Sequence, residues 1–514
     1  MKNRNYNIYF HTHTVSGIVI SVVLFVIFFA GSFSFFKEEI SNWERNESVI
    51  LHQETPFNTE IILDSISKKN SLNGRTISLY NINSRKITVS LDKSKDSLAT
   101  KEEKESKYFI LDTKTFKSSS YDDSYSLGEF LYRLHFLAQI PYPVGYYLSG
   151  LVALFFLFAI LTGVLLHWQK IVSNFYVFRP KEKLKTMWTD AHTSLGLIGL
   201  PFQFIYAVTG AFFMIKLVLL APIVSALYGG DQDKLYKDLE YSSASYEYKN
   251  MTLKPPFHIN ELVTKAKTKW ENYELTSLKI ENYGDVNMRL TAEGKLADNQ
   301  RFSGNGKIIF NVATGKIVEA KNPNTQTSYL DTVKSALYRI HFGDYGGYPL
   351  KIISFIMGII GCFVIISGVM IWLVARDKKN MPEHKRKFNR RVVRIYLAIC
   401  LSMYPITALT FVVAKLFYPL GQSGLYTFYF IGWLVLTLFF ILKRNDGFTT
   451  KYCLLFGSIL GFLIPITNGI VTGKWFCTTF NSEFQLFFVD VFWIALASIS
   501  LSVALKIFAK KLRE

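Results

Sequence analysis

Two hexapeptides, LYRLHF at residues 131–136 and LYRIHF at residues 337–342, occur once in each half of the 514-residue chain. Each precedes a long apolar run that carries a pair of small residues toward its end, Thr-Gly at 162–163 and Ser-Gly at 367–368. An internal repeat identifies structurally equivalent positions, so it is the first feature to interpret. The chain is predicted to be a duplication.

A second repeated signal lies upstream of the first. His13 and His192 are each followed by a glycine four residues later and by another eighteen residues later. The first half therefore extends roughly over residues 13–168 and the second roughly over residues 192–374, each with one histidine near its start and one shortly before its last apolar run.

Composition indicates a membrane protein. Half of the residues are hydrophobic and 16% are aromatic, and eight apolar stretches approach the roughly 20 residues that a helix needs to cross a bilayer. We predict an α-helical polytopic protein with about eight spans and an internally duplicated four-helix core. The predicted order is a span at 8–36, an outer module at 37–143, a span at 144–168, a basic loop at 169–195, a span at 196–221, an outer module at 222–350, a span at 351–376, a basic loop at 377–391 and a C-terminal extension of four spans at 392–514.

The net charge of +19 comes largely from lysine and arginine in the loops between spans. Such clustering is typical of the cytoplasmic loops of membrane proteins, so both termini are predicted to be cytoplasmic and both modules to lie outside. The chain carries no nucleic-acid-binding motif, and its basic surface is interpreted as a signal of topology beside membrane lipid. No nucleic acid is expected as a partner.

Each outer module is predicted to be a small α+β unit, because a helical stretch is followed by alternating polar and apolar residues. The first has a helix near 59–69 and strands near 76–81, 86–91 and 108–112. The second has a helix near 259–270, strands near 275–281, 287–291 and 307–312, and a Thr-Gly turn into a strand at 316–319.

These features carry a family resemblance. A His-x-x-x-Gly span, an outer module with a strand pair such as FNVATGKIVEA at 310–320, a Tyr-Arg-x-His segment and a span ending in Thr/Ser-Gly occur twice in this order. The arrangement resembles the PepSY-associated transmembrane family, often described as iron-regulated membrane proteins, over about residues 8–376. That family includes ferric-siderophore reductases of the bacterial inner membrane that carry haem between their helices. The resemblance implies an inner-membrane protein with two PepSY-like periplasmic modules, and it does not extend to residues 392–514.

The repeated histidines are the candidate cofactor ligands. The topology places His13 and His192 near the cytoplasmic face and His135 and His341 near the outer face. If a pseudo-twofold axis along the membrane normal relates the halves, His13 opposes His192 and His135 opposes His341. Opposed imidazoles are suited to be axial ligands of haem iron, so the sequence predicts two haem b groups with these four histidines on the iron.

Other residues near the histidines have more than one interpretation. The glycines allow a flat ring to approach the backbone, or allow ordinary close packing of helices. The arginines would pair with haem propionates or extend to lipid headgroups. Two further histidines lack a counterpart in the repeat and are weaker candidates, as substitute ligands, propionate partners or interfacial residues. The glycines are Gly31, Gly163, Gly210 and Gly368, the arginines are Arg133 and Arg339, and the two further histidines are His11 and His167.

Two haems stacked across a bilayer make an electron path from the cytoplasm outward. The chain has no nucleotide-binding glycine motif, so a separate cytoplasmic reductase or a membrane quinol is expected to be the electron donor. The resemblance implies a ferric siderophore or another Fe(III) complex as acceptor, and hence an oxidoreductase, with no catalytic residue assigned. Two alternatives stay open. One is a transition-metal or proton-coupled transporter that uses the same histidines, and the other is a non-redox scaffold that binds peptides or peptidases.

Overall fold

The computed structural model describes residues 3–47, 57–179, 181–239, 246–297, 303–378 and 380–513. Among these, eight helices are long and apolar enough to cross a membrane, which confirms the predicted multi-pass architecture. They are α1 (Asn3–Ser34), α5 (Val144–His167), α7 (Leu184–Tyr228), α11 (Gly347–Arg376), α12 (Glu383–Leu416), α13 (Gly421–Lys443), α14 (Asp446–Thr472) and α16 (Phe484–Arg513).

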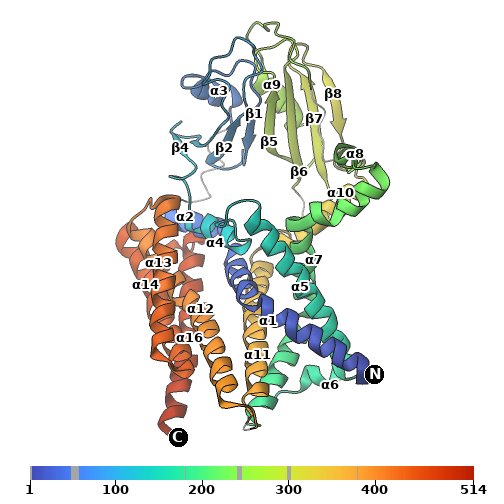
Figure 1. Cartoon of the computed structure of the whole chain (residues 1–514). Coiled ribbons are helices and arrows are strands. Elements are labelled where there is room, and N and C mark those ends of the chain that lie inside the picture. The colour runs from blue at the N-terminus through green and yellow to red at the C-terminus, as the bar shows by residue number, and fades with distance from the viewer. Residues whose placement is uncertain are drawn as a thin grey trace. The chain divides into compact units, whose positions relative to one another are not determined.

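The chain folds as two compact units (Figure 1). The helical unit contains Met1–Ser48, Tyr125–Ala221 and Ile340–Glu514, and the sheet unit contains Val49–Ser124 and Pro222–Arg339. The sheet unit is thus smaller than the two outer segments predicted from hydropathy. The difference arises because α2 (Lys37–Arg45) and α4 (Leu127–His135) pack against the spans.

In the repeated half of the helical unit, α1 packs against both α5 and α11. The helix α7 is the counterpart of α1 and bends at Ile215, where φ and ψ are −123° and 19°. It begins at Leu184, well before the apolar run at 196, so the helix extends into the basic loop predicted at 169–195. The loop between α5 and α7 also contains α6 (Ile171–Tyr176).

The C-terminal extension forms its own group of helices. The helix α14 packs against both α12 and α16, and α13 packs against α12. The short helix α15 (Phe476–Thr479) precedes α16. The extension adjoins the repeated core where α12 meets α11 and where α16 meets α2.

The sheet unit contains one antiparallel sheet in the order β4-β3-β2-β1-β5-β6-β7-β8. The two modules predicted separately are therefore joined edge to edge, because β1 pairs with β5 in the register Leu79 to Leu278. The strands are β1 (Ile77–Tyr80), β2 (Lys86–Leu91), β3 (Lys107–Asp112), β4 (Ser118–Ser120), β5 (Tyr273–Glu281), β6 (Arg289–Leu296), β7 (Asn305–Asn311) and β8 (Ile317–Lys321).

One hydrophobic core holds both modules together. The helices α3 (Thr59–Ser67) and α9 (Ile259–Lys267) contact each other and share this core with the strands. Their N-termini are capped reciprocally. The Asn58 side chain accepts from the Ile61 amide and from Asn260 Nδ2, and Asn260 Oδ1 accepts from the Thr59 amide at 2.9 Å. Orphan donors at the start of α3 are thereby satisfied, and the Asn260 amide of α9 donates in turn to Glu60 Oε1 at 3.0 Å.

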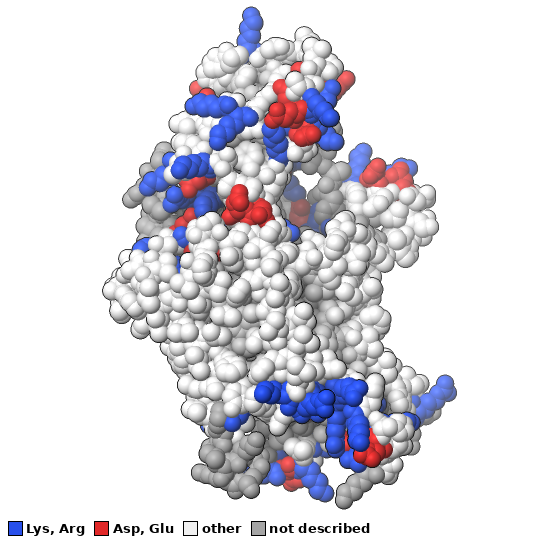
Figure 2. Space-filling model, turned by 60° about the vertical axis from the view of Figure 1, so that its left-hand side comes forward, with Lys and Arg blue, Asp and Glu red and all other residues white. Residues whose placement is uncertain are grey.

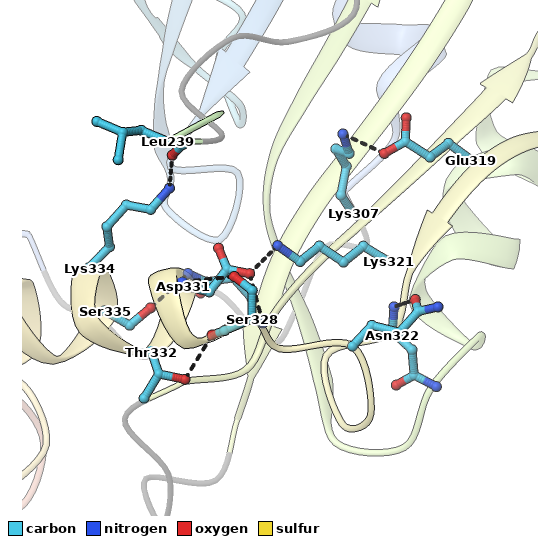
Figure 3. A network of polar contacts seen from close by, with 12 residues as sticks. Leu239, Lys307, Glu319, Lys321, Asn322, Ser328, Asp331, Thr332, Lys334 and Ser335 are labelled. Carbon is cyan, nitrogen blue, oxygen red and sulfur yellow. Dashed lines mark hydrogen bonds and ion pairs between the residues drawn. The ribbon is translucent and has the colours of Figure 1, made fainter. Parts of the chain in front are cut away.

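The helix α10 (Tyr329–Phe342) is tied at its start to the sheet and to α8 (Gln232–Asp238) (Figure 3). Lys321 of β8 forms an ion pair with Asp331 in the first turn of α10. One turn later, Lys334 Nζ donates to the carbonyl oxygen of Leu239 at 2.7 Å. The start of α10 is therefore fixed within the sheet unit.

Charged side chains are unevenly distributed over the surface of the helical unit. On the face shown in Figure 2, a broad zone of the helical unit carries no charged side chain among the described residues, and lysine and arginine gather at its lower end. Large apolar side chains are exposed along α5, including Leu151, Phe155 and Phe158. An apolar zone of this kind is the surface that lipid tails cover.

Candidate functional site

The first histidine pair joins the two halves of the repeat. The rings of His13 on α1 and His192 on α7 have centroids 6.0 Å apart, with an interplanar angle of 74°. His13 Nδ1 lies 2.8 Å from the carbonyl oxygen of Ala159 on α5. His192 Nδ1 lies 2.9 Å from the carbonyl oxygen of Val364 on α11. In the first half α1 carries the histidine and α5 accepts its hydrogen bond, and in the second half α7 and α11 do the same. The two imidazoles therefore face each other across the two halves.

The second pair, His135 and His341, has the same spacing. The ring centroids are 6.0 Å apart and the interplanar angle is 41°. Both histidines lie at the C-terminal ends of short helices, α4 and α10, rather than on the spans that follow. His135 Nδ1 is 2.9 Å from the carbonyl oxygen of Ile27, and His341 Nδ1 is 2.7 Å from Thr209 Oγ1.

The hydrogen bonds determine which ring nitrogen is free. A carbonyl oxygen only accepts, so Nδ1 of His13, His135 and His192 must carry the proton. Thr209 Oγ1 donates to the carbonyl of Ile205 at 2.6 Å, so it accepts from His341 Nδ1. Within the described ranges, no protein group bonds to Nε2 of the four histidines. Each Nε2 therefore offers a lone pair, and a bonded Nδ1–H is the usual second contact of a metal-bound histidine.

The spacing within each pair fits two ligands on one metal. A metal–imidazole nitrogen distance of about 2.0 Å on each side places two coaxial ring centroids about 6 Å apart, as both pairs have. The described residues contain no group of three or more His, Cys, Asp or Glu side chains that could hold a metal ion. The donor set fits a haem iron, which needs only two axial protein ligands.

Three of the four predicted glycines make room for the histidines. A Cβ on Gly31 would lie 2.5 Å from His135 Nδ1, one on Gly163 would lie 3.1 Å from His13 Cε1, and one on Gly368 would lie 3.2 Å from His192 Cε1. In each case the carbonyl that the histidine reaches belongs to the residue four positions before the glycine. The missing side chain opens that carbonyl to the imidazole.

Gly210 departs from this pattern. A Cβ there would lie 3.4 Å from Cβ of Ala153 and would not meet His341. Here the hydroxyl of the preceding residue, Thr209, replaces the backbone carbonyl as the hydrogen-bond partner of His341 Nδ1. Ser367 has a related position, because its Oγ lies 3.1 Å from His192 Nδ1. Sequence reasoning missed both hydroxyls, although each directly precedes a predicted glycine in the repeat.

The weaker candidates lie at different distances from the site. His167 is close enough to interact electrostatically with both His13 and His192. His11 is exposed and packs against the ring of Phe10, so the structure does not bring it to the inner pair.

The two arginines also differ in their surroundings. Arg133 Nε forms a 2.7 Å ion pair with Glu129 on the same helix, α4. Arg339 is partly buried on α10, two residues before His341.

The two pairs form layers at different depths. On α1, His13 belongs to one layer and Ile27 accepts from the other, fourteen residues later. A helix rises about 1.5 Å per residue, so the layers are separated by about 21 Å along α1. Phe25 of α1, which is buried, lies between these two positions. The arrangement can hold one metal group near each face of a membrane.

Comparison with known proteins assigns the family. No curated protein matches the chain. The family described as the PepSY-associated TM region matches residues 10–375, which include all four spans of the repeat, both histidine pairs and the sheet unit. The match ends at the start of the C-terminal extension, as the resemblance in the sequence does. This multi-pass membrane protein belongs to the PepSY-associated transmembrane family.

Proposed function

We propose that this protein carries electrons outward across the bacterial inner membrane and reduces an Fe(III) complex, with a ferric siderophore as the substrate. Two histidine pairs with 6.0 Å between ring centroids, one near each end of α1, carry this proposal. Haem b, held by His13 with His192 and by His135 with His341, would supply one-electron transfer when bound.

The protein's own residues have two tasks in this function. The Nδ1 bonds fix the orientation of each imidazole and keep Nε2 directed at the metal position. Buried apolar side chains between the layers, such as Phe25 of α1, exclude water. Both tasks favour electron transfer without rearrangement of the ligands.

The direction of transfer follows from the proposed topology. Arginine and lysine in the loops after α5 and α11 support cytoplasmic termini and a periplasmic sheet unit. A cytoplasmic reductase or a quinol would deliver each electron, and the outer histidine pair lies nearer the acceptor. Reduction of Fe(III) to Fe(II) weakens binding by hard oxygen ligands, so iron is released from the chelator.

The decisive experiment is a haem count on the detergent-purified protein, by pyridine haemochrome and a reduced-minus-oxidised spectrum. We expect about two b-type haems per chain. His13→Ala and His192→Ala should remove the same haem, and His135→Ala and His341→Ala the other. His11→Ala is the matched control, because His11 lies on α1 but is exposed, and it should leave both haems in place.

Activity is tested in spheroplasts that overproduce the protein. Reduction of an external ferric hydroxamate, followed with an Fe(II)-specific dye, should rise above the empty-vector level and fall to that level in His13→Ala. A folded protein without a Soret band, even after haem supplementation, would overturn the proposal. Metal analysis and proton-flux assays would then test the transporter, and peptide binding would test the scaffold.

A further inference from the structure

The short helix α2 contacts both α4 of the repeated core and the α12 and α16 helices of the C-terminal extension. It has nine residues and directly follows the first span. Despite a polar sequence, more than half of it is buried, namely Glu39, Ile40, Ser41, Trp43 and Glu44. Buried polar and charged groups require partners. Glu39 pairs with Lys351 of α11 at 2.6 Å, and the other partners lie in two further parts of the unit.

One set of partners belongs to the C-terminal extension. Trp43 Nε1 donates to Asp490 Oδ1 of α16 at 2.8 Å, and Asn468 Nδ2 of α14 donates to Asp490 Oδ2 at 2.8 Å. All three side chains are fully buried. Asp490 therefore links α14 and α16 to α2.

A cation from the third helix completes this cluster. Lys415 of α12 is buried, donates to the carbonyl oxygen of Trp43, and places Nζ 4.7 Å from the centre of the Trp43 ring. At the rim, Asn42 Nδ2 donates to Gln485 Oε1 of α16 at 2.6 Å. Three helices of the extension thus hold one short helix of the repeated core.

The other set of partners belongs to α4, the helix that ends in His135. Ser126 caps α4, and its Oγ lies 2.7 Å from Ser41 Oγ. The amide of Leu127 donates to Glu44 Oε2 at 2.7 Å. Gly128 lets the two helices approach, because a Cβ there would clash with the carbonyl oxygen of Lys37 and with Ser41 Oγ. The start of α4 is therefore fixed by α2.

The extension also touches α4 directly. Phe130 of α4 is fully buried, and its ring centroid is 4.8 Å from that of Tyr429 and 5.7 Å from that of Tyr426, both on α13. Just before α4, the hydroxyl groups of Tyr125 and Tyr426 are 3.3 Å apart. Aromatic pairs of this kind add to the stability of a contact beyond the area they bury.

The other outer histidine is held differently. His341 ends α10, which has no buried residue along its described length. In contrast, α4 buries Leu127, Gly128, Phe130, Leu131 and Leu134. The two halves of the repeat supply equivalent histidines, and within the described residues the helix α4 contacts both α2 and the α13 helix of the extension.

We infer that the extension, Glu383–Arg513, is a positioning element for the outer histidine pair. It fixes α4 directly through α13 and indirectly through α2, and so fixes the ring of His135. Trp43, Lys415 and Asp490 are positioning residues in this arrangement. The inference rests on the proposed function, and it assigns a role to the part of the chain that the family match does not cover.

The test compares two variants with a matched control. Asp490→Asn replaces one of the two oxygens that accept from Trp43 and Asn468 with an amide nitrogen, and Trp43→Phe removes the donor to Asp490 while keeping an aromatic ring. Ser402→Ala removes a buried 3.0 Å contact with Thr437 between α12 and α13, away from α2 and α4. The first two should shift the reduction potential and EPR signal of the haem that His135→Ala removes. They should also weaken its binding about 10-fold, as loss of outer contacts around metal ligands does.

The other haem should be unchanged in both variants, and Ser402→Ala should alter neither. A second measurement needs no cofactor. In the haem-free full-length protein, amides of Leu127–His135 should exchange faster in Asp490→Asn and Trp43→Phe than in the wild type. Unchanged potentials together with unchanged exchange in α4 would overturn this inference while leaving the proposed function intact. Absence of haem from the wild type would overturn the function, and exchange alone would then decide whether the extension supports α4.

Discussion

At the scale of single residues, three glycines determine where the imidazole rings can lie. An alanine methyl at position 31 would stand 2.5 Å from His135 Nδ1, well inside van der Waals contact. At position 210 the nearest neighbour would be the Cβ of Ala153 at 3.4 Å, which is ordinary contact. Equivalent positions of the repeat thus tolerate a methyl group differently.

We therefore expect Gly31→Ala to displace His135 and to lower the haem content from about two per chain toward about one. Gly210→Ala is the matched control and should keep both haems. The pyridine haemochrome assay on the purified variants measures this difference. Equal haem content in the two variants would show that Gly31 is not needed to position the imidazole of His135.

Thr209 supports a separate prediction about ligand orientation. Its Oγ1 is the acceptor for His341 Nδ1 at 2.7 Å and is buried. Thr209→Val keeps the shape but removes the acceptor, so haem affinity at the outer pair should fall about 10- to 100-fold. Thr209→Ser should restore most of it. Haem transfer to apomyoglobin measures the loss, and equal rates for the two variants would contradict it.

At the scale of elements, the anchor between α10 and β8 predicts a pH dependence. Burial acts to raise the pKa of Asp331, but the hydrogen bond and charge of Lys321 and the bonds from Ser328 outweigh it and leave the pKa below its ordinary value. A lowered carboxyl pKa stabilises the folded state above the unfolded pKa of about 3.9. The stabilisation is lost as the pH falls through the folded value.

We expect the protection of α10 amides against hydrogen exchange to fall below about pH 4 in the wild type. In Asp331→Asn, which cannot ionise, protection should already be lower at pH 6, by about 1 kcal/mol, and this acid-dependent step should be absent. Lys321→Met should also lower protection at pH 6, but it should keep a smaller acid-dependent step, because Asp331 still ionises and still accepts from Ser328. If the acid-dependent loss of protection had the same size in both variants and in the wild type, a group other than Asp331 would cause it.

In the sheet, the position of each strand is predictable from the sequence, but the pairing of strands depends on neighbouring elements. Helix and strand positions within each module follow from local periodicity, and the predicted strands near 86–91 and 307–312 match β2 and β7 closely. Local periodicity does not specify which edges pair. The join between β1 and β5 connects positions about 200 residues apart, and it depends on the shared core with α3 and α9.

At the scale of the whole molecule, one native cysteine reports the topology. Cys477 lies on α15 and is exposed, whereas Cys362, Cys400 and Cys453 are buried. With eight spans and a cytoplasmic N-terminus, α15 lies on the outer side. A membrane-impermeant maleimide should therefore label Cys477 in spheroplasts. Cys477→Ser should abolish the signal, and labelling only after lysis would place the termini outside.

The sequence by itself determined the eight spans, the duplication and the identity of the histidines that meet. Hydropathy is a local property, because each helix in lipid must satisfy its own backbone. The internal repeat then identifies equivalent positions in the two halves, which lie far apart in the sequence. It pairs His13 with His192 and His135 with His341. The sequence predicted that the glycines allow close approach of a haem ring or of another helix. In the structure, the group that approaches three of the four glycines is the imidazole ring of a histidine.

Tertiary structure alone decided the contacts that lie outside the repeat. The bond from Trp43 to Asp490 joins residues 447 positions apart, and the acceptor for His341 is the hydroxyl of Thr209 rather than a backbone carbonyl. Such contacts depend on how whole helices pack, and packing is set by the combined shape and polarity of several faces. A pattern within one segment carries no information about the partner face, so the role of α2 and of the C-terminal extension emerged only from the folded chain.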